Sequence, residues 1–275
     1  MGARQCVIRL SAALALAGCG GPGSGAEASS EDAPADLALT PPTIRLESGG
    51  LRLEEQSWRR GDEAGLAWRV SVALPGHASV SAVDSVADFS ALLPQDAGPW
   101  AAINGGFYDV GRAAMGLVVS AGQERAPLQK LGGSGIFFVG PTGPGVVHRD
   151  AWTPGPSEAL QSIDRLIDQG ASLVQRLDGS KAARSAVVVG KERLWIVALA
   201  ASTAAPGASE VTLDHTIGHG LTLGVFAQYL LQSTDAVAAL NLDGAVSTQL
   251  SVVTPDGRLD VHGERGTINA VVLRP

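Results

Sequence analysis

Two short clusters carry the side chains best suited to chemistry in this 275-residue chain. In each cluster an apolar run ends at a polar side chain that glycine follows, first at Asn104-Gly105-Gly106 and later at Asp243-Gly244. Glycine lets the backbone adopt positive φ angles and lets a ligand approach main-chain amides closely. Each cluster alone has the composition of an ordinary turn. The two together indicate a site at the ends of two strands.

Two other patterns do not predict a site. His215 and His219 have the spacing of a metal-binding pair on a helix, but no Glu completes a His-Glu-x-x-His arrangement, and the neighbouring glycines disfavour a helix. Around Ser134, Ile136 takes the place of the second glycine of a Gly-x-Ser-x-Gly nucleophile turn. We therefore expect no metal, no other cofactor and no serine nucleophile.

Short apolar runs separated by glycine-rich connections predict the strands that would hold the two clusters. Aromatic residues make up only 4% of the chain and there are 35 glycines, so the core must consist largely of Val, Leu, Ile and Ala on strands. The predicted strands cover residues 43–53, 66–74, 100–103, 115–120, 135–139, 146–149, 186–189, 194–198 and 236–242, with further runs at 252, 259–261 and 268–273.

Helices are expected in three places. A short helix over 84–93 would be capped by its first residue, and a helix over 222–231 would be capped by Thr222. A third helix over 157–169 would end before Gly170 and carry its apolar face on Leu160, Ile163 and Ile167. The expected fold class is therefore α/β of the α+β type, a single mixed and mainly antiparallel sheet-rich domain with a few flanking helices.

The first residues predict an export signal. An apolar run over 10–17 follows two arginines and is too short to span a bilayer. The run ends in Leu16-Ala17-Gly18-Cys19, which resembles a bacterial lipobox. We therefore expect a lipoprotein signal peptide over 1–18, a flexible tether over 19–42 that begins at the lipidated Cys19, and a folded domain over 43–275.

Composition also restricts partners and location. The net charge of −7 provides no basic surface for a nucleic-acid backbone, so nucleic acid is not expected as a partner. Cleavage before Cys19 leaves one cysteine, so the mature chain cannot form an internal disulfide. The expected location is the bacterial cell envelope, with the lipid anchor in the outer membrane, because Gly20 rather than a retention-signal Asp follows Cys19.

Several segments of the chain resemble, in the same order, the phosphodiester glycosidase family, which includes the uncovering enzyme that removes N-acetylglucosamine from a phosphodiester. The resemblance covers about residues 95 to 275. The segments are Asn104–Tyr108 for the family's Asn-Gly-Gly-Phe-Phe, Gly116–Val119 with Gly122, Ile136–Phe138, Leu160-Gln161-Ser162 with Leu166, Arg184-Ser185-Ala186, Asn241–Gly244 for Asn-Leu-Asp-Gly-Gly, and Arg265 with Ile268-Asn269-Ala270.

The chain departs from the family pattern at three places. Ala245 replaces the second glycine of the signature, Thr248 replaces the second serine of Ser-Ser, and Ile163-Asp164 replaces a Gly-Pro. Alanine disfavours positive φ. Either the turn is relaxed at Ala245 or the pocket differs, and the substrate is then in doubt more than the fold.

The resemblance implies a hydrolase that cleaves a sugar-1-phosphodiester of envelope or extracellular glycans. The leaving phosphomonoester needs little acid assistance, so the site requires a carboxylate and a cation with hydrogen-bond donors. Asp243 is the expected carboxylate and Arg184 the expected phosphate-binding cation, with amide donors from Asn104. Further substrate contacts are expected from Gly105, Gly106, Gly244, Ser247, Asp109 and Asp178, of which the two Asp residues are second-rank carboxylates.

Two alternatives remain at this point. The first is a non-catalytic envelope lipoprotein that uses the same fold to bind a glycan or a protein, and Ala245 favours it. The second is a plain glycoside hydrolase, which needs a second carboxylate about 5–9.5 Å from Asp243. Convergence of Asp243, Arg184 and Asn104 on one cleft would favour catalysis.

Overall fold

The structure, a computed structural model, describes residues 36–202, 204–213 and 218–275. The predicted signal peptide, Cys19, the tether up to residue 35 and His215 lie outside the described residues. Within the segment predicted as tether, β1 (Ala38–Leu39) pairs with β3 (Leu51–Arg60), so sheet structure begins before Thr43. No helix of the described ranges is long and apolar enough to cross a membrane.

The largest sheet has nine strands and contains the strands predicted over 186–189 and 194–198, which pair antiparallel as a hairpin. Its order is β1-β3-β4-β15-β14-β17-β12-β13, with β2 paired to β3, and every pairing is antiparallel. The remaining bounds are β2 (Thr43–Ser48), β4 (Glu63–Ala73), β12 (Arg165–Asp168), β13 (Ala171–Ser172), β14 (Arg184–Gly190), β15 (Arg193–Ala201) and β17 (Ala236–Asn241).

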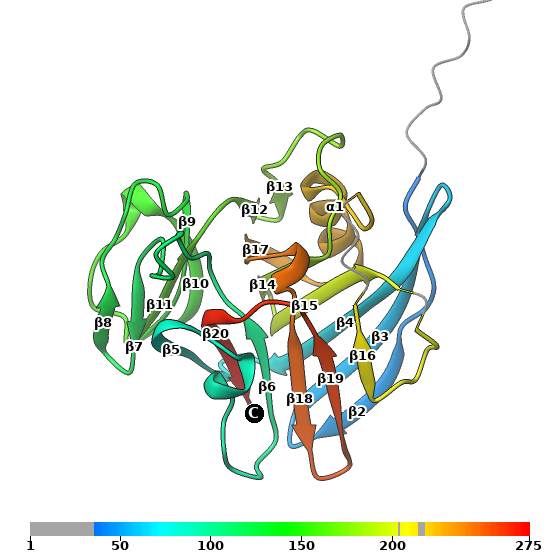
Figure 1. The fold of residues 1–275 in the computed structure, drawn as a ribbon, viewed down its shortest axis with the longest axis horizontal. Coiled ribbons are helices and arrows are strands. Elements are labelled where there is room, and N and C mark those ends of the chain that lie inside the picture. The colour runs from blue at the N-terminus through cyan, green and yellow to red at the C-terminus, as the bar shows by residue number, and fades with distance from the viewer. Residues whose placement is uncertain (1–35, 203, 214–217) are drawn as a thin grey trace, which may run out of the picture. The chain divides into compact units, whose positions relative to one another are not determined.

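Two smaller sheets complete the described part of the fold (Figure 1). The six-stranded sheet has the order β16 (Glu210–Thr212), β19 (Gly257–His262), β18 (Leu250–Thr254), β6 (Trp100–Asn104), β20 (Thr267–Arg274) and β5 (His77–Ala87). The five-stranded sheet has the order β10 (Gly143–His148), β9 (Gly135–Gly140), β11 (Glu158–Ser162), β7 (Val118–Ser120) and β8 (Gln123–Ala126). Among the described strands, only the pair β16 and β19 is parallel.

The mainly antiparallel sheet is confirmed, but the α/β class and the several flanking helices are overstated. The described residues contain one α-helix, α1 (Leu223–Ser233), and three short 3-10 turns, η1 (Phe89–Leu92), η2 (Arg149–Ala151) and η3 (Ala245–Ser247). Helix α1 begins as predicted, because Thr222 Oγ1 accepts a hydrogen bond from Val225 N at 3.4 Å. The fold is mostly β.

The helix predicted over 157–169 is wrong. Residues 158–162 form β11, which pairs with β7 and β9 and is buried on both faces, so strand pairing overrides the helical spacing of its apolar residues. Asp164 then adopts φ +63 and turns the chain into β12, while Gly170 belongs to the turn between β12 and β13. The helix predicted over 84–93 is also wrong, because β5 continues to Ala87 and only η1 follows.

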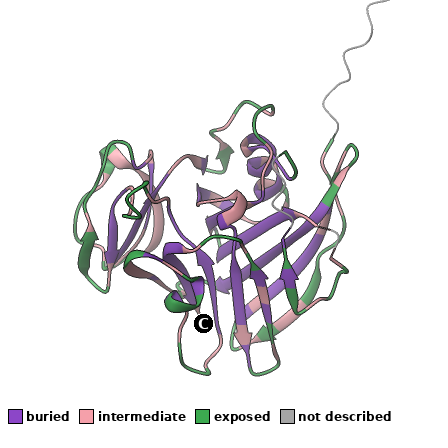
Figure 2. Ribbon diagram, viewed as in Figure 1, coloured by how far each residue is buried: buried purple, intermediate pink, exposed green. Residues whose placement is uncertain are grey.

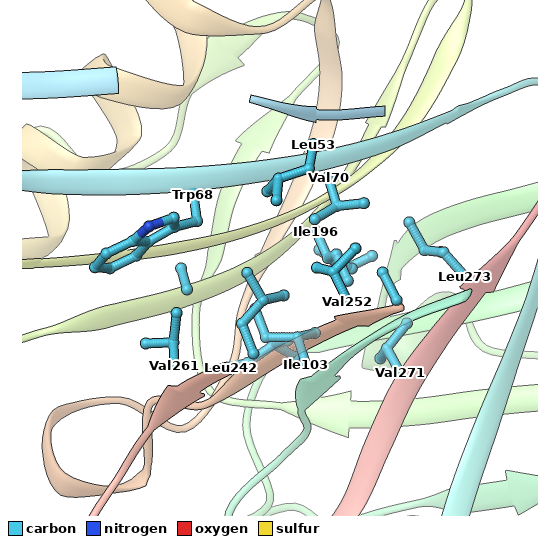
Figure 3. Packing of buried hydrophobic residues seen from close by; sticks show 14 of the residues in the cluster. Leu53, Trp68, Val70, Ile103, Ile196, Leu242, Val252, Val261, Val271 and Leu273 are labelled. Atoms are coloured by element: carbon cyan, nitrogen blue, oxygen red, sulfur yellow. The ribbon is translucent and has the colours of Figure 1, made fainter. Parts of the chain in front are cut away.

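Apolar side chains fill the space between the nine-stranded and six-stranded sheets (Figure 3). Leu53, Val70 and Ile196 of the larger sheet pack in one cluster with Ile103 and Val252 of the smaller one. Helix α1 covers part of the opposite face of the larger sheet, where the helix residues Val225, Phe226, Tyr229 and Leu230 belong to one cluster with Trp58, Val188, Val197 and Leu199. The central strands β14, β15 and β17 of the nine-stranded sheet are therefore largely buried (Figure 2), which fixes the positions of their ends.

Candidate functional site

The two sequence clusters meet although they are far apart in the chain. Asn104 is the last residue of β6, and Asp243 follows the end of β17. Asp243 N donates a hydrogen bond to Gly105 O at 2.9 Å, and Asn104 Nδ2 donates to Asp243 O at 2.6 Å. Leu242 N also donates to Ser185 O at 2.9 Å, which adds the start of β14. We call the meeting point of residues 104–106, 185 and 243–249 the strand-end junction.

Asn104 is the central side chain of the strand-end junction. It is fully buried, and its Oδ1 accepts hydrogen bonds from Ser185 Oγ at 2.8 Å and from Gln249 N at 3.0 Å. Its Nδ2 donates to Asp243 O, so both polar atoms of the amide are engaged within the protein. Asn104 therefore positions Asp243, and its role as a donor to substrate stays a prediction.

The amides of Gly105 and Gly106 are engaged in the same way. Gly105 N donates to Asn269 O at 2.8 Å, and Gly106 N donates to Asn269 Oδ1 at 2.7 Å. A Cβ on Gly105 would lie 2.0 Å from Asn269 Oδ1, and one on Gly106 would lie 2.7 Å from Gln161 O. Close packing explains why both positions hold glycine, and neither amide is available to a substrate as the sequence had suggested.

Asp243 is a half-buried carboxylate within a short turn. Its Oδ1 accepts a hydrogen bond from Gly244 N at 3.0 Å, and the buried Ser247 also hydrogen-bonds its side chain. Burial raises the pKa of Asp243 above its usual value, although these hydrogen bonds and the positive charge of Arg265 oppose the rise. The structure therefore brings Asp243, Gly244 and Ser247 together.

The turn at Ala245 is not relaxed. Ala245 adopts φ +51, in the left-handed region that favours glycine, and its N donates to Ala183 O at 2.9 Å. An L-residue in this region carries strain of roughly 1–2 kcal/mol. The alanine therefore adopts the left-handed conformation that glycine favours. The replacement of the second glycine is then no longer an argument that the pocket differs from the family pattern at this point.

Arg184 is placed at the start of β14 and is half-buried. Its Nε donates to Leu221 O at 2.8 Å and one terminal nitrogen, Nη2, donates to Ser180 O at 2.5 Å. Burial lowers its pKa to about 10, and the charge of Asp164 opposes this shift. The other terminal nitrogen, Nη1, donates no hydrogen bond to any residue in the described ranges. The Arg184 backbone adjoins Gly244, with its Cα 3.9 Å from where a Cβ on that glycine would lie.

A cavity of about 490 Å³ lies near these groups. The turn between β11 and β12, the segment 173–176, the ends of β9 and β10 and the start of α1 contribute its lining, which consists of Ser134, His148, Asp164, Arg165, Leu173, Val174, Gln175, Arg176 and Leu223. Asp164 links the cavity to the strand-end junction, because its O accepts a hydrogen bond from Asn241 N at 3.0 Å, two residues before Asp243. This cavity is the candidate cleft, although Asp243, Arg184 and Asn104 are not among the residues that line it.

Asp109 and Asp178 lie apart from the hydrogen bonds of the strand-end junction. Asp109 is exposed, and its Oδ1 accepts from Ala113 N at 3.0 Å within its own loop. Asp178 is exposed and pairs with Arg176 at 2.7 Å, and this hydrogen-bonded ion pair lowers its pKa. Neither contacts Asp243 in the described part of the chain, so the structure assigns them local structural roles.

Sequence reasoning missed the functions of Asn269, Arg265 and Asp164. Asn269 holds the glycine turn, and the charge of the exposed Arg265 acts on Asp243. Both lie in the segment that resembles the family's closing strand, and this resemblance is the sequence feature that could have identified them. Asp164 was visible only as a departure from the family pattern.

No group of three or more His, Cys, Asp or Glu residues in the described ranges is arranged to hold a metal ion. His219 is described and exposed, whereas His215 is not described.

The family model for phosphodiester glycosidases matches residues 97–274, and the chain belongs to this family. The catalytic domain of zebrafish N-acetylglucosamine-1-phosphodiester alpha-N-acetylglucosaminidase, auto-inhibited by its pro-peptide, is similar in structure, with a TM-score of 0.58, 15% identity and coverage of 90% of this chain and 85% of that one. A hypothetical protein from Synechocystis has a TM-score of 0.61 and 17% identity, with coverage of 89% and 64%. These likenesses show a shared fold. No curated protein matches the chain at a significant level.

Proposed function

We propose that this chain hydrolyses a sugar-1-phosphodiester at the anomeric carbon. The observation that carries the proposal is the position of Asp243, a half-buried carboxylate held by Gly244 and Ser247 at the junction that carries the family signature. The carboxylate would stabilise the oxocarbenium-like charge or activate the attacking water. Its raised pKa makes it a stronger base than an exposed Asp.

Two guanidinium groups are proposed to hold the phosphate. Arg184 retains a terminal nitrogen without a hydrogen bond to a described residue, and the charge of Arg265 already acts on Asp243. Guanidinium groups bind phosphate through paired donors. The phosphomonoester leaves as a stabilised anion, so the proposal does not need a strong general acid.

A plain glycoside hydrolase is the second candidate. Asp164 favours it, because this half-buried carboxylate lines the cleft and is joined through its backbone to Asn241. In that reaction one of Asp164 and Asp243 would act as the general acid, and the other would act as the nucleophile or the general base. Equal hydrolysis of simple glycosides and of sugar-1-phosphodiesters would support this candidate.

We further propose that the chain acts on envelope or extracellular glycans as a lipoprotein anchored at Cys19. The support is the lipobox-like sequence before Cys19 and the Gly, Ser and Pro-rich segment after it. Labelling with palmitate that persists in the Cys19→Ser variant would contradict anchoring through this cysteine.

The activity is tested by the release of free sugar from a panel of sugar-1-phosphodiesters. The purified chain should release sugar, and the Asp243→Asn variant should not. Asp109→Asn is the matched control, because it changes an exposed carboxylate outside the strand-end junction. A folded chain that is inactive on the whole panel would favour the binding-only lipoprotein.

A further inference from the structure

Asp164 has hydrogen-bonding capacity that the fold does not use. Asp164 lines the cavity of about 490 Å³, and its carboxylate accepts no hydrogen bond from a residue in the described ranges. Its backbone adopts φ +63, which costs energy for a residue other than glycine. The position therefore combines a strained backbone, partial burial and a carboxylate directed to no protein donor.

The other charged groups of the cavity wall are already neutralised by neighbours. Arg165 pairs with Asp168 at 2.9 Å, and Arg176 pairs with Asp178 at 2.7 Å. His148 Nδ1 accepts a hydrogen bond from Asp150 N at 3.2 Å. Asp164 is thus the charged group of the wall without an ion pair among the described residues, and its negative charge disfavours a phosphate at this place.

Arg184 stands near Asp164 without contacting it as an ion pair. Its pKa responds to the charge of Asp164, but no ion pair within 4.0 Å joins the two among the described residues. Each group therefore keeps free hydrogen-bonding positions. An acceptor-only carboxylate can bind two neighbouring hydroxyl groups.

The apolar part of the cavity wall fits the same type of ligand. Leu173, Val174 and Leu223 line it together with Asp164, and Leu173 is 44% exposed. A sugar ring presents C–H groups on its faces and hydroxyls at its edge. A wall with apolar side chains beside one free carboxylate offers a partner to each.

We infer that Asp164 selects the sugar of the substrate by accepting hydrogen bonds from two adjacent hydroxyls of a neutral sugar ring in this cavity. The link to catalysis rests on the proposed function, whereas binding of the sugar requires no turnover.

Binding of free sugars to the full chain, followed by NMR titration, tests the inference. The probes are glucose, mannose and N-acetylglucosamine, deoxy analogues that lack one hydroxyl of an adjacent pair, and inorganic phosphate. The Asp164→Gly and Asp164→Asn variants keep the backbone conformation accessible, because both residues tolerate positive φ. The Asp150→Asn variant is the matched control, since it changes a carboxylate that is 73% exposed beside the cavity.

At least one neutral sugar should bind, with a Kd at least 10-fold weaker in both Asp164 variants and unchanged in Asp150→Asn. Removal of one hydroxyl should weaken binding to the wild type more than to Asp164→Gly. Equal sugar binding by wild type and Asp164→Gly, no binding of any neutral sugar, or displacement of bound sugar by phosphate from the wild type would each overturn the inference. Sugar binding that depends on Asp164, without hydrolysis of any sugar-1-phosphodiester, would contradict the proposed function but not this inference.

Discussion

The strand-end junction and the cavity beside it use polar groups in opposite ways. In the junction, Asn104 and the amides of Gly105 and Gly106 are buried and hydrogen-bonded within the protein. In the cavity wall, Asp164 retains free hydrogen-bonding positions. The residues that match the family signature mainly hold the backbone in place. The capacity to recognise a ligand lies next to them, at a position where the chain departs from that pattern.

The largest effect is expected for Asp243→Asn. This change keeps the oxygen that accepts from Gly244 N but removes the charge, so turnover should fall by about 100-fold or more while the fold persists. Sugar release and thermal unfolding should be measured on the same samples. Activity at the wild-type level would remove Asp243 from the mechanism.

A large loss of stability is expected for Asn104→Ala. The change leaves Ser185 Oγ, Gln249 N and Asp243 O without their buried partner, which should lower the free energy of unfolding by about 3 kcal/mol. Urea denaturation measures this difference. The contrasting variant is Gln175→Ala in the exposed cavity wall, where a change within about 0.5 kcal/mol is expected. Equal losses in the two variants would contradict the distinction between the two regions.

A moderate effect on pH dependence is expected for Arg265→Ala. Burial raises the pKa of Asp243 and the charge of Arg265 opposes the rise, so removing that charge should raise the pKa further. Activity that requires the ionised carboxylate is lost as the pH falls through this pKa, and the acid limb of kcat/KM should therefore move to higher pH. Arg125→Ala, which removes the exposed partner of Asp84, should leave the limb in place.

The raised pKa of Asp243 also makes the stability of the protein depend on pH. Activity is lost as the pH falls, whereas the contribution of this group to stability is lost as the pH rises. Between the unfolded pKa of an Asp and the higher folded value, the folded state binds more protons, so this group's contribution to stability falls as the pH rises. The free energy of unfolding of Asp243→Asn relative to wild type should therefore increase with pH across that window. Urea denaturation at several pH values measures it, and a difference independent of pH would contradict the assigned shift.

The smallest effect is expected for Ala245→Gly. Glycine relieves the strain at φ +51 but gains freedom in the unfolded chain, so the net stabilisation should be about 1 kcal/mol or less. Ala64→Gly in β4 is the matched change at an exposed strand position and should destabilise by about 0.5–1 kcal/mol. Destabilisation by both variants would show that the turn at Ala245 carries little strain.

The features predicted correctly from the sequence depend on local signals. Thr222 caps α1 through a contact three residues away, and Asn104 and Asp243 follow apolar runs that become buried strands. Residues 157–169 were not predictable in this way. Their apolar spacing suits a helix, and only the pairing of β11 with β7 and β9 makes residues 158–162 a strand.

The hydrogen bonds of the site were beyond prediction for a related reason. Whether Gly106 N faces a ligand or the protein depends on Asn269, which is 163 residues away. The free carboxylate of Asp164 depends on a left-handed turn that replaces the expected helix. Such contacts follow from the packing of sheets and have no local sequence signal.

The strand-end junction also has a kinetic consequence. Its contacts join residues from β6, β14, β17 and β20, which come from widely separated parts of the chain. Contacts between distant residues form late and slowly, because the intervening chain must first be ordered. Activity should therefore return only after β-structure during refolding. Until these contacts have formed, the incompletely folded chain should be inactive.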